Sequence, residues 1–492
     1  MNKNWKRYLL LVLIAVMCVG LLPVPAYAED LPYDTYNYDY WENIVPTPAA
    51  YVPAGSISGI SLEIGAFVNP QDVCVAPDGD LYIADTGNNR IVVVDAETLR
   101  VTKVIDSFDN KGTADKFNAP YGVCVSENEQ IYIADKENQR IVVLELDGSF
   151  VKVISNPQSE VLEEGFVFKP LKVTVDYADR VYCIAQNMFQ GIMVFENNGN
   201  FTGFFGTINV QLSLWEKFWK KVATKEERKN QQLYVATEFT GLDIDSDGFV
   251  YATNVDETGM QGVRRLNPKG EDVIKKGENE NVGGDLWITG TGAYSGVSRI
   301  TDVVYRENGM YSLLDQKRGR IFTYDYEGNL LYIFGGVGTQ EGTFTTPVAI
   351  EQWGGHLLVL DASRATICLF SPTEYGTLIN QAVALRYDGD ETQAVALWER
   401  ILELDENNEL ANTGIGKAYL SAGDNVTAMK YLEKGMNREY YSVALKRYRS
   451  DLLRNHMGTV LTSIVVLAVA VKLLLVVRDR VKSKKERRRM VK

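Results

Sequence analysis

A repeat of about fifty residues begins with Asp72-Val-Cys-Val-Ala-Pro-Asp-Gly-Asp-Leu-Tyr-Ile-Ala-Asp85, followed by Asn88-Asn-Arg-Ile-Val-Val-Val94. A second copy contains Gly122-Val-Cys-Val125, Ile131-Tyr-Ile-Ala-Asp135 and Asn138-Gln-Arg-Ile-Val-Val143. Short apolar runs rich in Val, Ile and Tyr, separated by Asp-Gly turns, are typical of antiparallel strands. Self-similarity at this period predicts an architecture of repeated small sheets.

Further copies follow along the middle of the chain, and they start near Phe168, Phe239, Arg299 and Thr346. Six copies of about four strands each predict a six-bladed β-propeller over residues 51–375, because blades arranged around an axis protect their sheet edges. The predicted fold class is therefore mainly β, with a short α-helical region and one transmembrane helix after the propeller.

These motifs resemble NHL repeats in the Pro-x-Gly/Asp-Val start, the Tyr-Ile-Ala-Asp strand and the Asn-x-Arg-Ile strand. The resemblance covers about residues 65–375 and is closest in the first two copies, whereas the fourth has Asn254 and the sixth has Thr366 at motif positions. It implies the propeller fold and says little about activity, since one fold serves many functions.

Three copies carry an Asp and an Arg five residues apart, at the end of one strand and the start of the next. This spacing predicts an ion pair or turn clamp within one blade, with ligand contact as the alternative. The pairs are Asp85 with Arg90, Asp135 with Arg140 and Asp315 with Arg320.

The two ends of the chain predict a membrane topology. Residues 1–28 combine a basic start, an apolar run and an Ala-Tyr-Ala site, which is typical of a secretory signal peptide. Residues 458–477 are apolar apart from Lys472 and are long enough to span a bilayer. Because basic flanks stay in the cytoplasm, residues 478–492 are expected inside the cell and the N-terminal domains outside it. We expect a single-pass cell-membrane protein of a Gram-positive bacterium.

The formal net charge of -13 divides along this topology. Residues 29–457 carry -24, whereas residues 458–492 carry +8. Such an acidic ectodomain lacks the basic footprint that nucleic-acid binding requires. Nucleic acid is therefore excluded as a partner.

Between propeller and span, residues 376–457 show helical periodicity. Gly389-Asp390 is echoed 34 residues later by Gly423-Asp424, and Ala394 is echoed by Ala428. This period resembles that of tetratricopeptide (TPR) repeats. At the other end of the propeller, residues 29–50 look like an aromatic, proline-containing linker.

The chemistry-bearing residues are sparse. The chain has two histidines, His356 and His456, too few for a histidine-based metal or lyase centre. The segment Asp243-Ile-Asp-Ser-Asp-Gly248 resembles the start of a calcium loop, but Asn254 occupies the position of the final ligand, which favours an ordinary turn. No metal site, catalytic residue or cofactor is predicted, and the protein is expected not to be an enzyme.

The cysteines fit no disulfide framework. Cys18 lies in the signal segment, and the other four lie in apolar strand patterns, where buried thiols behave as small hydrophobes. These four are Cys74, Cys124, Cys183 and Cys368.

Aromatic side chains supply the candidate partner-binding residues. Residues 212–222 predict an amphipathic helix, for which packing on the propeller, partner binding and membrane contact are the alternatives. A Gly-rich loop carries one further Trp, and the 29–50 segment is dense in Tyr and Trp, which could bind a partner, stack on sugar or pack on the protein itself. The candidates are Trp215, Phe218, Trp219, Trp287, Tyr36, Tyr38 and Trp41.

The sequence thus favours a membrane-anchored extracellular binding scaffold that presents a propeller and a TPR-like surface to protein partners. An accessory role in an envelope transport or glycan-handling complex is the first hypothesis, with carbohydrate as a further candidate ligand. The alternative is a metal-dependent propeller hydrolase or lactonase with a carboxylate site on the axis.

Overall fold

The computed structural model describes residues 31–162, 165–207, 238–256, 262–277, 283–286 and 295–490. They fall into two compact units, Met1–Thr377 and Leu378–Lys492, and each unit is described by itself. The predicted signal peptide, the predicted 212–222 helix with Trp215, Phe218 and Trp219, and the loop residue Trp287 lie outside the described residues.

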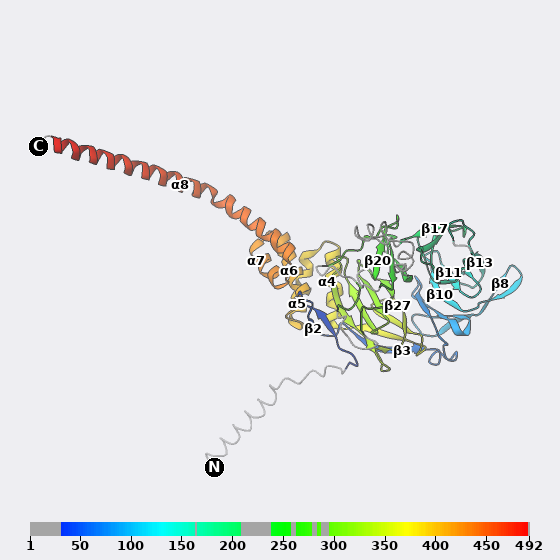
Figure 1. Cartoon of the computed structure of the whole chain (residues 1–492). Coiled ribbons are helices and arrows are strands. Elements are labelled where there is room, and N and C mark those ends of the chain that lie inside the picture. Colours follow the sequence, from blue (N-terminus) through cyan, green and yellow to red (C-terminus); the bar gives the residue numbers. More distant parts are fainter. Residues whose placement is uncertain are drawn as a thin grey trace, which may run out of the picture. The chain divides into compact units, whose positions relative to one another are not determined.

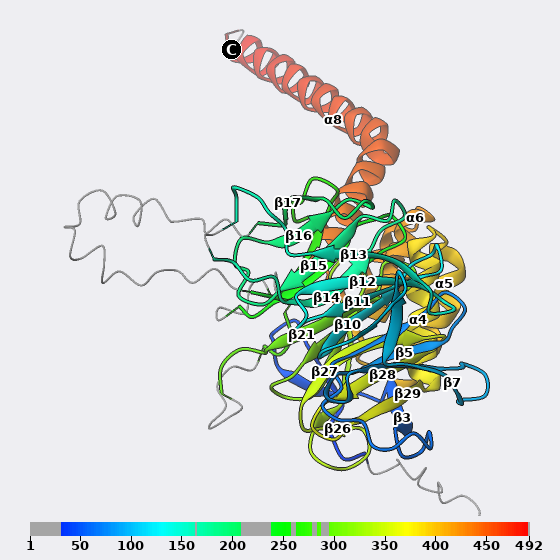
Figure 2. The same cartoon turned by 90° about the vertical axis from the view of Figure 1, so that its right-hand side faces the viewer.

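The first unit is a six-bladed β-propeller, as the repeat predicted (Figure 1). Each blade is an antiparallel sheet whose strands follow one another in sequence, as Figure 2 shows for β14 to β17. From inner to outer strand, blade I is β4 (Asp72–Val75), β5 (Leu81–Asp85), β6 (Arg90–Val94) and β7 (Val101–Ile105); blade II is β10 (Pro120–Val125), β11 (Gln130–Asp135), β12 (Arg140–Glu145) and β13 (Phe150–Ser155); blade III is β14 (Pro170–Val175), β15 (Val181–Ala185), β16 (Ile192–Phe195) and β17 (Phe201–Phe205).

The second half of the ring repeats this plan. Within the described residues blade IV has three strands. Blade IV is β18 (Phe239–Ile244), β19 (Val250–Asn254) and β20 (Val263–Leu266); blade V is β21 (Ile300–Tyr305), β22 (Tyr311–Asp315), β23 (Arg320–Tyr324) and β24 (Leu330–Phe334); blade VI is β27 (Pro347–Trp353), β28 (His356–Asp361), β29 (Thr366–Pro372) and β3 (Tyr51–Ser58).

Strand β3 closes the ring, because this N-terminal strand is the outermost strand of the C-terminal blade. It pairs antiparallel with β29, with Ser58 opposite Thr366 and Tyr51 opposite Pro372. The phenol oxygen of Tyr51 also accepts a hydrogen bond of 2.6 Å from the buried Arg306 of blade V. The pairing completes blade VI with a strand from the other end of the chain, and so holds the first and last parts of the propeller together.

The core lies between neighbouring blades, where the apolar faces of consecutive sheets pack on each other. Ile91 and Val93 of blade I, for example, share one cluster with Val123 and Ile131 of blade II. These β-branched side chains suit a half-buried pleated surface, and each of the four is at most 4% exposed. The repeated Ile-Val pattern therefore supplies the packing that holds the ring together.

The recurring Asp–Arg pairs are structural clamps in blades I and II. Asp85 pairs with Arg90 at 2.7 Å, and its second oxygen accepts the Val68 N–H at 2.8 Å. Asp135 pairs with Arg140 at 2.8 Å in the same way. The predicted ion pairs are confirmed there, and each clamp ties the loop before the blade to the end of its second strand.

The third predicted pair has a different partner. Arg320 lies opposite Asp315 in the strand register, but its guanidinium binds Asp285 at 2.7 Å. Asp315 instead accepts hydrogen bonds from the backbone of Arg299 and Lys317. The expected intra-blade pair is wrong here, because a buried carboxylate from a distant loop competes for the guanidinium.

The first unit also contains three pairs of short strands and one helical turn outside the blades. They are β1 (Tyr36–Tyr38) with β2 (Ile44–Pro46), β8 (Ser107–Asn110) with β9 (Thr113–Lys116), β25 (Gly336–Val337) with β26 (Thr343–Phe344), and the 3-10 turn η1 (Thr86–Asn88). The segment expected to be a linker thus contains the β1–β2 hairpin.

The second unit is helical, and the unit boundary falls inside α4. Consecutive helices of this unit, from α5 onward, pack against each other in sequence order. The helices are α4 (Glu374–Tyr387), α5 (Glu391–Leu404), α6 (Glu409–Ser421), α7 (Asn425–Lys434) and α8 (Arg438–Met490).

The 34-residue echo marks equivalent helix starts. Gly389 and Gly423 both have positive φ, of 82° and 85°, and each precedes an aspartate that caps the next helix. Asp390 accepts the backbone N–H of Gln393, and Asp424 that of Thr427. Helical hairpins are therefore present at the expected period, while their identity as TPR repeats stays a prediction.

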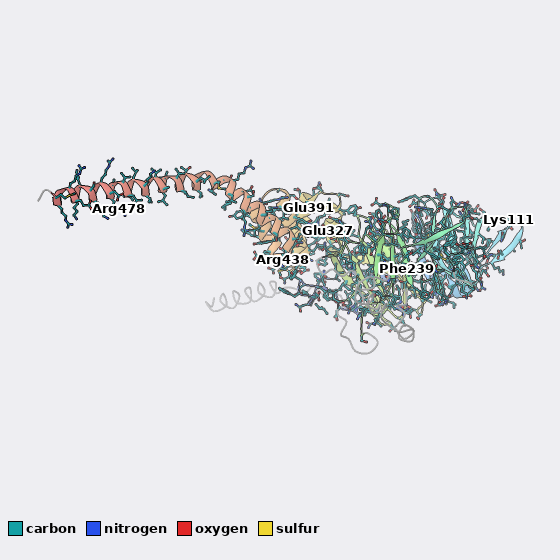
Figure 3. The ribbon with its side chains drawn as sticks, turned by 45° about the horizontal axis from the view of Figure 1, so that its top comes forward. Lys111, Phe239, Glu327, Glu391, Arg438 and Arg478 are labelled. Carbon is teal, nitrogen blue, oxygen red and sulfur yellow. The ribbon has the colours of Figure 1, made fainter. Side chains whose placement is uncertain are left out.

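Helix α8 contains an 18-residue window with a mean hydropathy of 2.8, so it is long and apolar enough to cross a membrane. None of that window is buried within the chain, and in Figure 3 side chains project outward on several sides of α8 around Arg478. An all-round apolar helix needs a nonaqueous environment, which a bilayer supplies.

Candidate functional site

A cavity of about 320 Å³ lies on the propeller axis, and we call it the axial cavity. Residues of the inner strands of all six blades line it: β4, β10, β14, β18, β21 and β27. Its wall carries several ionisable side chains, among them Lys172, Asp243 and Glu351. The cavity is therefore the candidate functional site.

The narrow part of the axis is formed by one equivalent residue from each inner strand. Charged residues come from blades I, III and V, and small residues come from blades II, IV and VI. In blade order these residues are Asp72, Gly122, Lys172, Gly241, Asp302 and Ala349.

Lys172 joins the two aspartates across the axis, and we call Asp72, Lys172 and Asp302 the axial triad. Its Nζ lies 2.5 Å from Asp72 Oδ1 and 3.1 Å from Asp302 Oδ2. The side chains of Lys172, Asp72 and Asp302 are 10%, 5% and 4% exposed, so water screens the charges little. Burial disfavours the charged lysine, but the carboxylates of Asp302 and Asp72 outweigh it and raise the pKa of Lys172. The triad thus ties three alternate blades together through charge.

Aspartates on the inner strands also bind the backbone of the following blade. Each such carboxylate accepts an N–H that the inner edge of the next sheet would otherwise leave unpaired. The bonds run from Val123 N to Asp72 Oδ2 at 3.0 Å, from Tyr305 N to Asp243 Oδ2 at 2.5 Å, and from Ile350 N to Asp302 Oδ2 at 3.0 Å.

The small residues make this close approach possible. A Cβ on Gly122 would lie 2.4 Å from the carbonyl oxygen of Leu171, and a Cβ on Gly241 would lie 2.6 Å from the Cα of Asp302. Both distances are too short for a side chain. Glycine is therefore required where the inner strands converge beside the triad.

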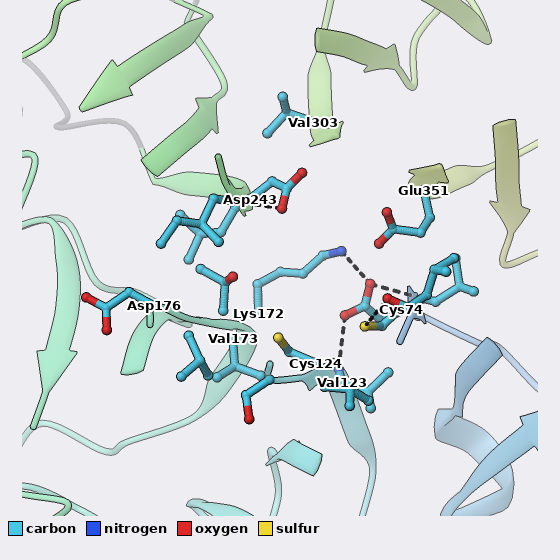
Figure 4. A pocket seen from close by; sticks show the side chains of 18 of the residues that line it. Cys74, Val123, Cys124, Lys172, Val173, Asp176, Asp243, Val303 and Glu351 are labelled. Atoms are coloured by element: carbon cyan, nitrogen blue, oxygen red, sulfur yellow. Dashed lines mark hydrogen bonds and ion pairs between the residues drawn. The ribbon is translucent and has the colours of Figure 1, made fainter. Parts of the chain in front are cut away.

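Two further carboxyl groups, those of Asp243 and Glu351, point with Lys172 toward a common centre (Figure 4). Burial, reinforced by the nearby charge of Asp302, raises the pKa of Asp243 to about 7. Burial and the charge of Asp243 raise the pKa of Glu351 well above its usual range. Because one lysine serves several carboxyl groups, part of this set holds protons near neutral pH.

Polar residues surround the wider part of the cavity. Tyr177 lies there and is 61% exposed. Its partial burial is the main cause that raises the pKa of its phenol, and the nearby charges of Glu127 and Asp245 add to the effect. Asp245 is paired with Arg265 at 2.6 Å and caps its own turn. The calcium-like segment is therefore an ordinary blade turn held by an internal guanidinium, as expected.

The axial residues do not fit a divalent cation. The ammonium of Lys172 already occupies the position between Asp72 and Asp302, and those carboxylates also accept backbone N–H groups. Across the described part of the chain, no three His, Cys, Asp or Glu residues are arranged to hold a metal. We therefore derive no chemical step through a metal.

Neither histidine lines the axial cavity. His356 begins β28, where its Nδ1 lies 2.9 Å from the Ser371 hydroxyl, and His456 lies in α8. The ionisable groups of the cavity are carboxyl, thiol, phenol and ammonium groups. They can hold or exchange protons, and they can bind a ligand through hydrogen bonds.

The structure separates the aromatic residues of the N-terminal segment. Tyr36 is 3% exposed, with its ring under the guanidinium of Arg320, and Tyr38 hydrogen-bonds to Asp285. Trp41, at the hairpin turn, is 70% exposed. Tyr36 and Tyr38 thus pack on the propeller itself, while Trp41 faces solvent.

Sequence reasoning allowed for carboxylates on the axis but did not identify the triad or Glu351. The signal was present, because the residue two positions after Pro70, Pro120, Pro170 and Pro347 alternates between charged and small. Asp72, Gly122 and Lys172 show it in the three clearest copies. Opposite charges at equivalent repeat positions predict a bridge across the ring.

Comparisons with known proteins agree with the fold. Residues 67–94 and 117–144 match the family model of the NHL repeat. No curated protein matches the chain in sequence.

Solved propeller structures are similar in shape only. A streptogramin B lyase has 14% identity and a TM-score of 0.39, over 62% of this chain and 94% of that one. A virginiamycin B lyase from Staphylococcus aureus has 12% identity and a TM-score of 0.38, over 69% and 95%. A protein described as a putative gluconolactonase has 11% identity and a TM-score of 0.39, over 69% and 98%. Similarity this low carries no argument about activity.

Proposed function

We infer that the protein is a non-catalytic binding scaffold, held at a membrane by α8, that presents its propeller and helical region to protein partners. The observation that carries this proposal is the apolar window of α8, none of which is buried within the chain. If α8 lies in a membrane, it anchors the propeller there, and the propeller offers partners a rigid surface.

Charge supports the direction of insertion. The residues after the span are strongly basic, whereas residues 29–457 carry -24. Basic flanks are retained in the cytoplasm, so the propeller would face the outside and residues 478–492 the inside. The binding function is assigned to the propeller and the helices on that outer side.

The axial triad supports the non-catalytic part of the proposal. Lys172 is paired with both Asp72 and Asp302, so these two carboxylates serve to join blades. Partners are expected on the outer surface, where Trp41 offers an exposed aromatic anchor. Envelope transport or glycan-handling proteins are the first partners to test, and sugar stacking on Trp41 is the carbohydrate alternative.

The test is cross-linking in intact cells, followed by detergent extraction and quantitative recovery of proteins bound to the full-length chain. A defined partner should be recovered with the wild type, and Trp41→Ala should reduce its recovery several-fold. Ile60→Ala is the matched control, because Ile60 is 73% exposed and lies away from the hairpin in sequence. The double variant Trp215→Ala/Trp219→Ala tests the predicted helix in the same assay. Recovery of the chain alone, as a monomer, would contradict the proposal.

A second candidate function is the lactonase-like hydrolase, and the observation in its favour is the set of carboxyl groups on the axis. Asp243 and Glu351 carry raised pKa values of the kind that acid–base catalysis uses. The test is lactone hydrolysis by the full chain with and without Ca²⁺ or Mn²⁺. Turnover that Asp243→Asn abolishes would establish this function, and no turnover in any of these conditions would dismiss it.

A further inference from the structure

The axial cavity opens at one end of the propeller, where each inner strand turns into the second strand of its blade. The exposed side chains of Glu127 and Tyr177 line the cavity at this end. The axial triad lies near the start of the inner strands and so forms the opposite, narrow end. We call the six connections at the open end the inner turns, and they are residues 76–80, 126–129, 176–180, 245–249, 306–310 and 354–355.

The inner turns are strongly acidic. They contain nine Asp or Glu residues and two Arg residues, a formal charge of -7. The turns between second and third strands lie at the other end of the blades, and in blades I, II, III, V and VI they carry four basic residues and one acidic residue, or +3. The cavity therefore opens at the negative end of the propeller, whose field attracts cations. The acidic residues of the inner turns are Asp78, Asp80, Glu127, Glu129, Asp176, Asp179, Asp245, Asp247 and Glu307.

Two carboxyl groups deeper in the cavity have no cation of their own. Asp243 of β18 and Glu351 of β27 come two residues after the narrow ring, on the side of the inner turns. Figure 4 shows their carboxyl groups on either side of the Lys172 ammonium. Both accept hydrogen bonds from backbone N–H groups, and among the described residues neither forms an ion pair. With Asp72 and Asp302, four carboxyl groups thus share one ammonium group in this part of the cavity.

A buried acceptor at the narrow end also lacks a donor. Asp302 lines the cavity and is 3% exposed. Its Oδ2 is bound to Lys172 and to the backbone of Ile350, whereas its Oδ1 accepts no hydrogen bond from any described group. Buried polar atoms of folded proteins nearly always have a partner in the protein, in water or in a ligand. The cavity therefore has unused capacity for a hydrogen-bond donor as well as for positive charge.

We propose that the axial cavity binds a linear aliphatic amine with two or more ammonium groups, one between Asp243 and Glu351 and the next at the inner turns beside Glu127. An ammonium group has three N–H donors, and carboxylates accept them in strong, charge-assisted hydrogen bonds. Val175 and Ile244 line the cavity between these two levels and would contact the methylene chain. The levels are two to three residues apart along the inner strands, about 7–10 Å, and a chain of four to six carbons bridges such a gap.

The site favours such an amine over other cations. The charge of Lys172 is already balanced by the carboxylates of Asp72 and Asp302, so it leaves the charge of the other two carboxyl groups to a ligand. A quaternary ammonium group has no N–H to donate to them. At the open end the ring of Tyr177, 61% exposed, offers its face to the second ammonium group. Binding needs no turnover and no membrane, so it stands apart from both candidate functions.

The experiment is isothermal titration calorimetry of the full-length chain in a nonionic detergent, at pH 7.5 and low ionic strength. The probes are 1,5-diaminopentane, pentylamine and the neutral 1,5-pentanediol. The diamine should bind at one site per chain, because an acidic surface without a site would take up several molecules. Pentylamine should bind roughly ten-fold more weakly, since it lacks the second charged contact, and the diol should not bind.

Variants separate the two ends of the ligand. Glu351→Gln should weaken the binding of both amines roughly ten-fold, because the deep ammonium group loses a carboxylate. Glu127→Gln should weaken only the diamine, to the affinity of pentylamine. Since Glu127 is exposed, this variant is expected to fold normally, which circular dichroism verifies for every variant. Glu399→Gln removes the same charge from the exposed side of α5 and is the matched control, with unchanged affinity.

Three results would overturn the proposal. The first is a diol that binds as tightly as the diamine, which would assign the cavity to neutral ligands. The second is diamine binding that does not saturate at one site per chain. The third is an unchanged diamine affinity in folded Glu351→Gln and in folded Asp243→Asn, which would place the amine outside the cavity.

Discussion

Replacing Lys172 by methionine removes the positive charge from the axial triad and keeps a side chain of similar length. The carboxylates of Asp72 and Asp302, 5% and 4% exposed, would then remain buried without their cation. Removing one partner of a buried ion pair costs about 3–5 kcal/mol. For the propeller, residues 51–372, an unfolding entropy of about 2.1 cal/mol/K per residue converts this into a Tm loss of about 4–7 °C.

The assay is thermal unfolding of the full-length protein in detergent, followed by circular dichroism. Lys169→Met is the matched control, because Lys169 pairs with Glu137 at 2.7 Å on the surface, where an ion pair contributes at most about 1 kcal/mol. A triple variant that adds Asp72→Asn and Asp302→Asn to Lys172→Met should recover much of the loss, since no buried charge is left unpaired. A Lys172→Met variant that melts no lower than Lys169→Met would show that the charge of Lys172 does not stabilise the propeller.

The remaining predictions concern pH, packing and anchoring. Burial raises the pKa of Asp302 to about 6 and that of Asp243 to about 7, so the folded state binds more protons than the unfolded state between about pH 4 and pH 7. The Tm should therefore fall by a few degrees from pH 5 to pH 8, less so in Asp243→Asn; a Tm that rises over this interval would contradict the assigned protonation. Gly241→Ala places a Cβ 2.4 Å from Asp302 Oδ1 and should cost roughly 1–3 kcal/mol in urea unfolding, whereas Gly355→Ala, with no atom within 4 Å, should be neutral. Deleting the chain from residue 458 onward should move the protein from the carbonate-resistant membrane fraction to the soluble fraction, and a truncated protein that stays in the membrane would disprove the anchor.

Most of the fold could be predicted from the repeat, because motifs such as Tyr82-Ile-Ala-Asp85 specify strand, turn and clamp within about twenty residues. The repeat pattern does not predict which strand closes the ring. Tyr51–Ser58 has no repeat signature, and its partner β29 lies more than three hundred residues away in the chain. Pairing at that separation depends on the finished ring and leaves no local pattern.

The axial site likewise depends on contacts between residues that are far apart in the sequence. Lys172 lies 100 residues from Asp72 and 130 residues from Asp302, so only the alignment of repeats relates them. The burial of Tyr36 likewise depends on Arg320, 284 residues away, which an aromatic-rich segment does not reveal by itself. Local spacing predicts the blades, whereas contacts across the ring need the geometry of all six.

The measurement that tests the scaffold most directly is the composition of the complex extracted from native membranes in mild detergent. Native mass spectrometry of the tagged full-length chain reports its bound proteins and their stoichiometry. We expect a species in which the chain is accompanied by a second polypeptide, at a ratio that Trp41→Ala lowers and Ile60→Ala does not. A single chain with no bound protein, at every detergent concentration that keeps membrane complexes intact, would contradict it.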